Sequence, residues 1–234
     1  KAFGGQMYEV IIGGAALNQE VEQFLKRIDF PYTVGYGATE CAPIICYEDW
    51  HYFAPGSCGK AAYHMEVRID SPDPQNVPGE ILTRGLNTML GYYKNDEATR
   101  ETLDREGWYH TGDLGTMDYA GNVFINGRIK NMLLGPNGQN IYPEEIEDKL
   151  NSMTMVVESV VVQRDNKLVA LVYPDYDEAK NLKFTAEDIR NVMDQNLNGL
   201  NEMIPAYEKV SEIEIREEEF EKTPKRSIKR YLYT

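Results

Sequence analysis

The periodicity of apolar and polar residues changes twice along the chain, which divides it into three stretches. The first stretch has an apolar run at residues 10–12 that ends at two glycines, which predicts a short buried strand. Residues 19–28 place apolar side chains on one helical face, and Asn18 is suited to cap this helix. A second strand is expected at residues 32–35. Strand, helix and strand in this order indicate an α/β unit, in which ligands bind at the carboxyl ends of the strands.

The second stretch, residues 56–126, alternates apolar and polar positions in short segments that glycine and proline separate. Segments 65–69 and 80–83 are examples. This pattern predicts a small antiparallel β-sheet or barrel.

The third stretch begins after Arg128. A proline-initiated helix is expected from residue 143 to about 153, followed by a hairpin over residues 156–173. A further helix is expected to begin with a capping box at residues 185–188 and to end at about residue 197, and a last strand is expected at 210–215. We therefore predict an α/β fragment with a small antiparallel β-barrel, followed by a compact α+β C-terminal domain. The predicted domains are residues 1–128, the C-terminal portion of a larger domain, and residues 129–234.

Net charge, apolar run length and cysteine content argue against several classes of protein. The 234 residues carry a formal net charge of -14 and have a pI of about 4.7, which argues against bulk binding to nucleic acid. No apolar run approaches the roughly 18 residues of a transmembrane helix. Three cysteines without a C-x-x-C pair argue against a disulfide scaffold or a zinc site and favour a cytoplasmic protein. Because the chain opens with Lys1 and enters a strand almost at once, we expect it to be a piece of a longer protein.

A glycine-rich segment at residues 35–40 carries the first candidate chemistry. Tyr36 offers a face on which adenine can stack, and Gly37 lets backbone approach a flat ring or a phosphate. Thr39 offers a hydroxyl to a phosphate oxygen, and Glu40 suits Mg²⁺, which prefers one or two carboxylates plus substrate phosphates. A dinucleotide fingerprint fits poorly because its third glycine is missing. The alternative is an ordinary glycine-rich turn.

The second candidate site lies in the run from Trp108 to Leu114, together with Gly127 and Arg128. Asp113 lies on a predicted tight turn, and Arg128 ends the next hairpin. A carboxylate can accept from both hydroxyls of a ribose, and arginine adds a fixed fork of donors beside it. The alternative is a surface ion pair on a strand-turn-strand unit.

The order of the motifs is more specific than any one of them. They are Gly13-Gly14-Ala15-Ala16-Leu17, Tyr36-Gly37-Ala38-Thr39-Glu40, Gly79-Glu80-Ile81-Leu82, Gly91-Tyr92-Tyr93, Thr111-Gly112-Asp113-Leu114, Gly127-Arg128-Ile129-Lys130-Asn131 and Pro143-x-Glu145-Ile146-Glu147. Over nearly the whole chain this series resembles the adenylate-forming superfamily, which includes acyl-CoA synthetases, luciferases and peptide-synthetase adenylation domains. The pattern is most similar to that of a bacterial fatty-acyl-CoA ligase.

The resemblance implies a two-step reaction. A carboxylate attacks the α-phosphate of ATP with Mg²⁺, which gives an acyl-adenylate, and coenzyme A then displaces AMP. Tyr36 would stack near adenine with Gly37 beside it, Thr39 and Glu40 would contact phosphate and magnesium, and Asp113 and Arg128 would hold the ribose. Gly13, Gly14 and Ala15 would line the adenine and acyl side.

Two further assignments come from the resemblance. Lys130 occupies the hinge about which a mobile C-terminal domain swings. Gly138 belongs to a loop, residues 135–140, that faces the site when the thiol acceptor binds.

The chain departs from the family pattern in two places. It lacks the glycine-, serine- and threonine-rich phosphate loop, so we expect the isolated chain to be inactive. In the tail, Arg226 and Ser227 stand where the family has glycine and the catalytic lysine. A nearby lysine must then supply the charge, and because Pro224 favours an extended backbone we predict Lys225 over Lys229.

These observations predict part of an ATP-dependent fatty-acid–CoA ligase, with a fatty acid and coenzyme A as its substrates. The alternatives are an inactive nucleotide- or partner-binding module, or an adenylating enzyme with another acid or a carrier-protein acceptor. We expect no nucleic-acid partner and no transmembrane segment, and the prediction leaves room for peripheral membrane contact.

Overall fold

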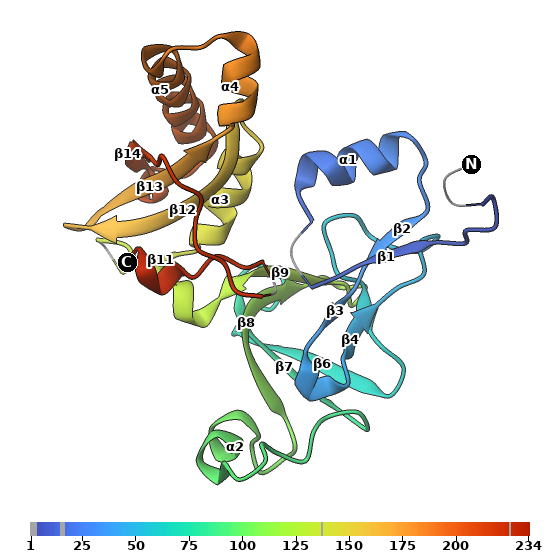
Figure 1. Cartoon of the computed structure of the whole chain (residues 1–234). Helices are drawn as coiled ribbons and strands as arrows, with labels where there is room; N and C mark the ends of the chain where they lie inside the picture. Colours follow the sequence, from blue (N-terminus) through green and yellow to red (C-terminus); the bar gives the residue numbers. More distant parts are fainter. Residues whose placement is uncertain (1–3, 15–16, 137, 225) are drawn as a thin grey trace. The chain divides into compact units, whose positions relative to one another are not determined.

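The computed structural model describes residues 4–14, 17–136, 138–224 and 226–234 (Figure 1). The chain divides into two compact units, Lys1–Lys130 and Asn131–Thr234. The division lies two residues beyond the one expected from the sequence. Each unit is described by itself.

The first unit opens with a strand-helix-strand motif. Strands β1 (Val10–Ile12) and β2 (Tyr32–Val34) pair in parallel, and α1 (Gln19–Arg27) connects them. The Asn18 side chain accepts hydrogen bonds from two amides of the first helical turn at 2.9 and 3.2 Å, which confirms the predicted cap. The predicted burial of β1 is wrong: Ile11 is 53% exposed, because none of the described residues covers that side of the strand. The apolar face of α1 is likewise open, with Phe24 49% exposed.

Two antiparallel sheets make up the rest of this unit. The first has the order β3-β4-β5 and the second β6-β7-β8-β9. Their strands are β3 (Tyr36–Gly37), β4 (Ile44–Tyr47), β5 (Lys60–Ala61), β6 (Met65–Asp70), β7 (Gly79–Gly85), β8 (Tyr109–Met117) and β9 (Val123–Arg128). Helix α2 (Asp96–Thr102) lies in the connection between β7 and β8.

The predicted β-barrel is wrong. Within the described residues β6 and β9 are the two edges of an open sheet and do not pair with each other. Closure of a barrel requires the first and last strands to meet, and this depends on strand tilt and register. The alternating pattern of the sequence indicates half-buried strands. It does not indicate whether the two edge strands pair with each other.

A single buried cluster joins the two sheets of the first unit. Tyr36, Ile45, Ile81, Tyr109 and Val123 belong to it, each at most 8% exposed. The three cysteines are also buried here and unpaired. The side chains that carry the predicted chemistry thus lie at the border of a packed core.

The second unit is a three-layered α+β fold. Its central sheet has the order β12-β13-β14, antiparallel between the first pair and parallel between the second. The elements are the two-stranded β10 (Leu133–Leu134) and β11 (Asn140–Ile141), α3 (Pro143–Asn151), β12 (Val156–Arg164), β13 (Lys167–Pro174), α4 (Tyr176–Leu182), α5 (Ala186–Met203) and β14 (Val210–Ile215). The short α4 was not predicted, and α5 continues past its expected end at residue 197.

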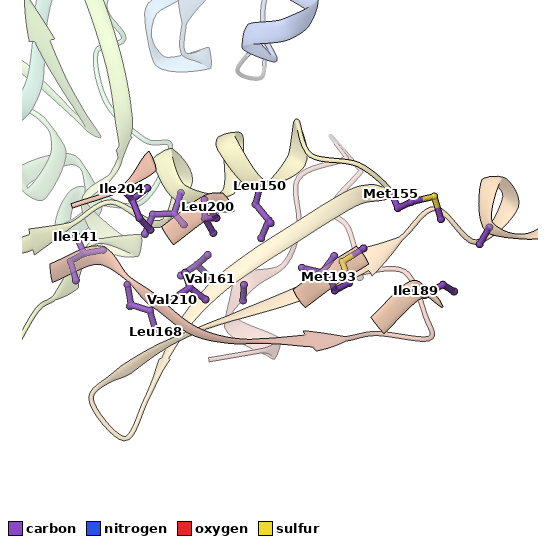
Figure 2. Close-up of a cluster of buried hydrophobic side chains, with 14 residues drawn as sticks. Ile141, Leu150, Met155, Val161, Leu168, Ile189, Met193, Leu200, Ile204 and Val210 are labelled. Atoms are coloured by element: carbon purple, nitrogen blue, oxygen red, sulfur yellow. The ribbon is translucent and has the colours of Figure 1, made fainter. Parts of the chain in front are cut away.

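Both faces of this sheet are covered. Side chains from α3 and α5 pack on one face, where Leu150, Met193 and Leu200 meet Val161 (Figure 2). On the other face, Val160, Val162, Val169 and Leu171 pack against Phe220 from the C-terminal tail. A strand that is buried on both faces carries a continuous apolar run rather than an alternating one, as residues 168–172 do.

The capping box expected at the start of α5 is confirmed. The Thr185 hydroxyl accepts from the Asp188 amide, and the Asp188 carboxylate accepts from the Thr185 amide at 2.7 Å. Among the described residues, no helix is long and apolar enough to cross a membrane.

Candidate functional site

The centre of the candidate site is Asp113 on β8, which the hairpin register places directly opposite Arg128 on β9. The Arg128 Nε donates to Asp113 Oδ1 at 2.8 Å, and the Tyr36 hydroxyl donates to Asp113 Oδ2 at 2.6 Å. Tyr36, which the sequence analysis placed in a different motif, is therefore in direct contact with the predicted pair of Asp113 and Arg128. Such charge-assisted hydrogen bonds are worth about 1.5–3 kcal/mol each.

Burial differs sharply across this group. The Asp113 side chain is 11% exposed, whereas that of Arg128 is 60% exposed. Burial chiefly, and then the negative charge and hydrogen bond of Asp113, raise the pKa of Tyr36 well above its usual value. Tyr36 is thus a neutral donor that holds the carboxylate in place. Its ring belongs to the core cluster, so the predicted stacking on adenine stays a prediction.

A glutamate that the sequence analysis quoted without a role fixes the turn before Asp113. Glu80 accepts from the Gly112 amide at 3.0 Å through one oxygen, and its other oxygen lies 2.8 Å from His110 Nδ1. Gly112 has a φ of 69°, a left-handed conformation that glycine adopts readily. The Thr111 hydroxyl donates to the backbone and accepts from the Asp113 amide at 3.0 Å. The side chains of Glu80 and Thr111 therefore fix the backbone that orients Asp113.

The second group of predicted residues follows β3. Glu40 lies in a short 3₁₀ turn, Thr39–Cys41, and its Oε1 accepts from the Tyr92 hydroxyl at 2.8 Å. Thr39 is exposed. A Cβ on Gly37 would lie 2.2 Å from the carbonyl oxygen of Pro43, so this turn needs glycine for close packing. Tyr92, like Glu80, was not assigned a role from the sequence.

The two groups lie near each other in the first unit. Tyr109, at the start of β8, shows this: burial raises its pKa most, and the charges of Glu40 and Asp113 both raise it further. The described residues contain no cluster of three or more metal-binding side chains. Glu40 by itself suits a Mg²⁺ ion that takes most of its ligands from substrate phosphates and water.

Gly13 and Gly14 follow β1, and Gly35 follows β2, the parallel strand beside it. A Cβ on Gly13 would come within 3.3 Å of the Gly35 carbonyl oxygen. Gly14 has a φ of 89°, and both Gly13 and Gly14 are exposed. Ala15 lies outside the described residues. The structure therefore places Gly13 and Gly14 on an exposed turn at the carboxyl end of β1, and their ligand-lining role stays a prediction.

Two predicted residues lie at or beyond the end of this unit. Lys130 is exposed in a 3₁₀ turn, Ile129–Asn131, and is the last residue of the first unit. Gly138 belongs to the loop that joins β10 and β11, where its φ is 80° and its amide donates to the Gly135 carbonyl at 2.9 Å. Their predicted hinge and acceptor-facing roles stay predictions.

The C-terminal tail contains the last predicted residues. Lys225 lies outside the described residues. Lys229, the alternative, donates from Nζ to Glu221 Oε2 at 3.1 Å, and this contact raises its pKa. Arg230 forms an ion pair with Glu147 of α3, a buried carboxyl whose other oxygen accepts from the Val161 amide at 2.6 Å. The sequence analysis quoted Glu147 in its motif but missed this pair.

Two family models together match most of the chain. Residues 1–93 match the model of the AMP-binding enzyme family, and residues 130–233 match the model of the AMP-binding enzyme C-terminal domain. A chloroplastic long-chain-fatty-acid–[acyl-carrier-protein] ligase of Arabidopsis thaliana is 30% identical over 205 residues, which are 80% of this chain and 28% of that protein. A 4-coumarate–CoA ligase of Oryza sativa subsp. japonica is 36% identical over 166 residues, or 65% of this chain and 30% of that protein.

Solved structures show the same fold. O-succinylbenzoate coenzyme A synthetase from Bacillus subtilis in complex with AMP has a TM-score of 0.79 at 22% identity, covering 95% of this chain and 45% of the synthetase. The same synthetase with ATP and a magnesium ion has a TM-score of 0.76 at 20% identity, covering 98% of this chain and 48% of the synthetase. The chain thus spans less than a third of the two curated relatives and less than half of the synthetase.

Proposed function

Since this chain belongs to the AMP-binding superfamily of adenylate-forming enzymes and corresponds to the C-terminal portion of its members, we propose that the protein containing it is an AMP-forming acid–CoA ligase. The observation that carries the proposal is the contact of Tyr36, Asp113 and Arg128. Asp113 is a buried carboxyl beside the exposed Arg128, and a carboxylate with a neighbouring arginine is suited to accept from both hydroxyls of a ribose.

In the proposed first step, a substrate carboxylate oxygen attacks the α-phosphate of ATP and pyrophosphate leaves. Asp113 and Arg128 hold the ribose, Thr39 contacts a phosphate oxygen, and Glu40 is a ligand of the Mg²⁺ that accompanies ATP. Gly13, Gly14 and Ala15 are proposed to line the adenine and acyl side of the site, and Gly37 to lie beside the adenine. Positioning and charge neutralisation carry most of such a step.

In the proposed second step, the thiol of coenzyme A displaces AMP. Lys130 is the proposed hinge between the two half-reactions, and the loop with Gly138 faces the thiol acceptor. The sequence-based proposal assigns a tail charge in the first step to Lys225.

A fatty acid is the proposed substrate, which the plant ligase among the relatives supports. The 4-coumarate and O-succinylbenzoate enzymes make aryl acids the main alternative. A carrier-protein acceptor is the alternative to coenzyme A, and the proposed location is cytoplasmic. A panel of fatty and aryl acids, assayed for thioester formation with the complete protein, separates the substrates.

The test of the site is Asp113→Ala in the complete protein. Two charge-assisted hydrogen bonds to ATP are lost, so ATP binding should weaken by about 2–4 kcal/mol. The matched control is Asp104→Ala, which disturbs the turn before the same strand, where Asp104 accepts from the Glu106 and Trp108 amides. This control should lower the melting temperature but leave the KM for ATP unchanged. An unchanged KM and kcat in Asp113→Ala would overturn the assignment.

The alternative for the isolated 234-residue chain is an inactive nucleotide- or partner-binding module. ATP raises the melting temperature of a protein that binds it in the native state. A rise in melting temperature without pyrophosphate release would support the binding module.

A further inference from the structure

Strand β8 departs from a regular ladder just before Asp113. The register of β7 against β8 shifts between Glu80 and Leu82. Residues 111–113 of β8 therefore lie opposite Ile81 alone. A bulge of this kind bends its strand and redirects a side chain, and bulges are common beside active sites. Asp113 thus lies at the end of a bulge, and the direction of its carboxylate depends on what holds the bulge in shape.

Two side chains bind the backbone of this bulge. Glu80 Oε1 accepts from the Gly112 amide at 3.0 Å. The Thr111 hydroxyl donates to the Ile81 carbonyl at 2.7 Å and accepts from the Asp113 amide at 3.0 Å. The Thr111 residue is 8% exposed and the Glu80 side chain 19% exposed, so water replaces these partners only in part. A buried amide that loses its partner is costly, and the bulge therefore depends on both side chains for its shape.

The carboxylate of Glu80 is itself held in one orientation. Its Oε2 lies 2.8 Å from His110 Nδ1, while its Oε1 binds the Gly112 amide. The strand that carries Glu80, β7, pairs with β6 over six residue pairs without a register shift. A side chain orients another reliably when it stands on a rigid element and makes a second hydrogen bond of its own. Glu80 meets both conditions.

We propose that Glu80 is a positioning residue that makes the site selective for a nucleotide with both ribose hydroxyls. This rests on the proposed function, in which Asp113 accepts from the ribose diol. A diol is bound by two directional hydrogen bonds at once, so a small displacement of the carboxylate weakens both. Glu80 sets the place of that carboxylate through the Gly112 amide and the bulge, rather than through contact with the nucleotide. A nucleotide without the two hydroxyls gains nothing from this arrangement.

The test compares ATP with 2′,3′-dideoxy-ATP in the complete protein, by pyrophosphate exchange with an acid that the protein activates. In Glu80→Ala the KM for ATP should rise about 10- to 100-fold, the range typical of removing a partner that orients a ligand-binding group. The KM for the dideoxy nucleotide should change by less than about threefold, so the selectivity between the two nucleotides collapses. A merely structural role would raise both constants alike.

Three further variants identify the cause. Glu80→Gln keeps an acceptor for the Gly112 amide, so it should retain most of the selectivity. Glu80→Ala added to Asp113→Ala should cost nothing further, because residues that act through one group are not additive. Thr111→Val removes the second support of the bulge and should also lower the selectivity. The matched control is Glu66→Ala, which removes an exposed carboxylate of the neighbouring strand β6 and should change neither constant.

The outcomes separate this inference from the proposed function. Unchanged selectivity in Glu80→Ala would overturn the inference, as would full additivity in the double variant. If Glu80→Ala does not fold, unchanged selectivity in Thr111→Val would overturn it. Loss of selectivity in Asp113→Ala but not in Glu80→Ala would leave the proposed function standing without this inference. If Asp113→Ala keeps the selectivity, or the unsubstituted protein shows no exchange with any acid, the proposed function fails and the inference fails with it.

Discussion

The buried pair of Glu147 and Arg230 makes the stability of the second unit depend on pH in a direction that can be worked out. Burial raises the pKa of Glu147 from 4.5 to about 7, although Arg230 and the Val161 amide act to lower it. The folded state therefore holds a proton on this carboxyl more tightly than the unfolded state does. The contribution of Glu147 to the free energy of unfolding is therefore greatest below pH 4.5. It falls as the pH rises towards 7 and is constant above that pH.

The size of the effect follows from the same pKa. Each pKa unit corresponds to about 1.4 kcal/mol. The rise in the pKa of Glu147 therefore lowers the free energy of unfolding by about 3 kcal/mol between pH 4.5 and 7. The variant Glu147→Gln keeps an acceptor for Arg230 and Val161 but cannot titrate. Its opening free energy should therefore lack this part of the pH dependence, and the difference between the two proteins should change by about 3 kcal/mol from pH 4.5 to 7.

Hydrogen exchange of the β12 and β13 amides, corrected for intrinsic exchange at each pH, measures this opening free energy. The control is Glu214→Gln, which removes the exposed partner of Arg164, a pair with both side chains more than 40% exposed. Exposed pairs contribute about 0–1 kcal/mol, so this variant should follow the unsubstituted protein. Parallel pH profiles for Glu147→Gln and the unsubstituted protein would refute the reasoning.

The remaining predictions concern three backbone positions. Gly37→Ala should destabilise the first unit by about 1–3 kcal/mol, because the new Cβ would clash with the Pro43 carbonyl; urea unfolding followed by tryptophan fluorescence measures it, and an unchanged midpoint would contradict it. Its counterpart is Gly199→Ala in α5, where the new Cβ would make only an ordinary van der Waals contact with Met153 at 3.9 Å and stability should instead rise by about 0.5–1 kcal/mol. Lys130→Pro in the complete protein fixes one φ near about -65°. It should spare pyrophosphate exchange and slow thioester formation, whereas equal loss of both rates would argue against a hinge.

Local patterns of the fold were predictable where short-range chemistry decides the structure. The Asn18 cap and the Thr185 capping box depend on hydrogen bonds over two or three residues, and both are present. The lack of pairing between β6 and β9 within the described residues and the two-sided burial of β13 were not predictable, because they depend on which distant segments pack against these strands. The C-terminal tail that covers one face of β13 is separated from it by more than 40 residues.

The candidate site shows the same limit. The contact of Asp113 with Arg128 follows from one hairpin, so the sequence could place these two residues together. The tyrosine that completes the cluster lies 77 residues from Asp113, and Glu147 lies 83 residues from Arg230. No periodicity connects positions that far apart. Glu80 was visible only as part of a quoted motif, because its partners Gly112 and His110 are set by strand pairing.

The turn between β8 and β9 makes the site sensitive to insertions and deletions. Asp118 ties the turn by accepting from the backbone of residues 120 and 122, which fixes the length of the hairpin that sets Asp113 opposite Arg128. Because side chains alternate between the two faces of a strand, loss of a single residue here would turn Arg128 to the opposite face. Over evolutionary time, this hairpin should therefore accept changes of residue at its exposed positions, such as Tyr119, more readily than any change in length. A one-codon deletion in the turn would harm the site more than several substitutions around it.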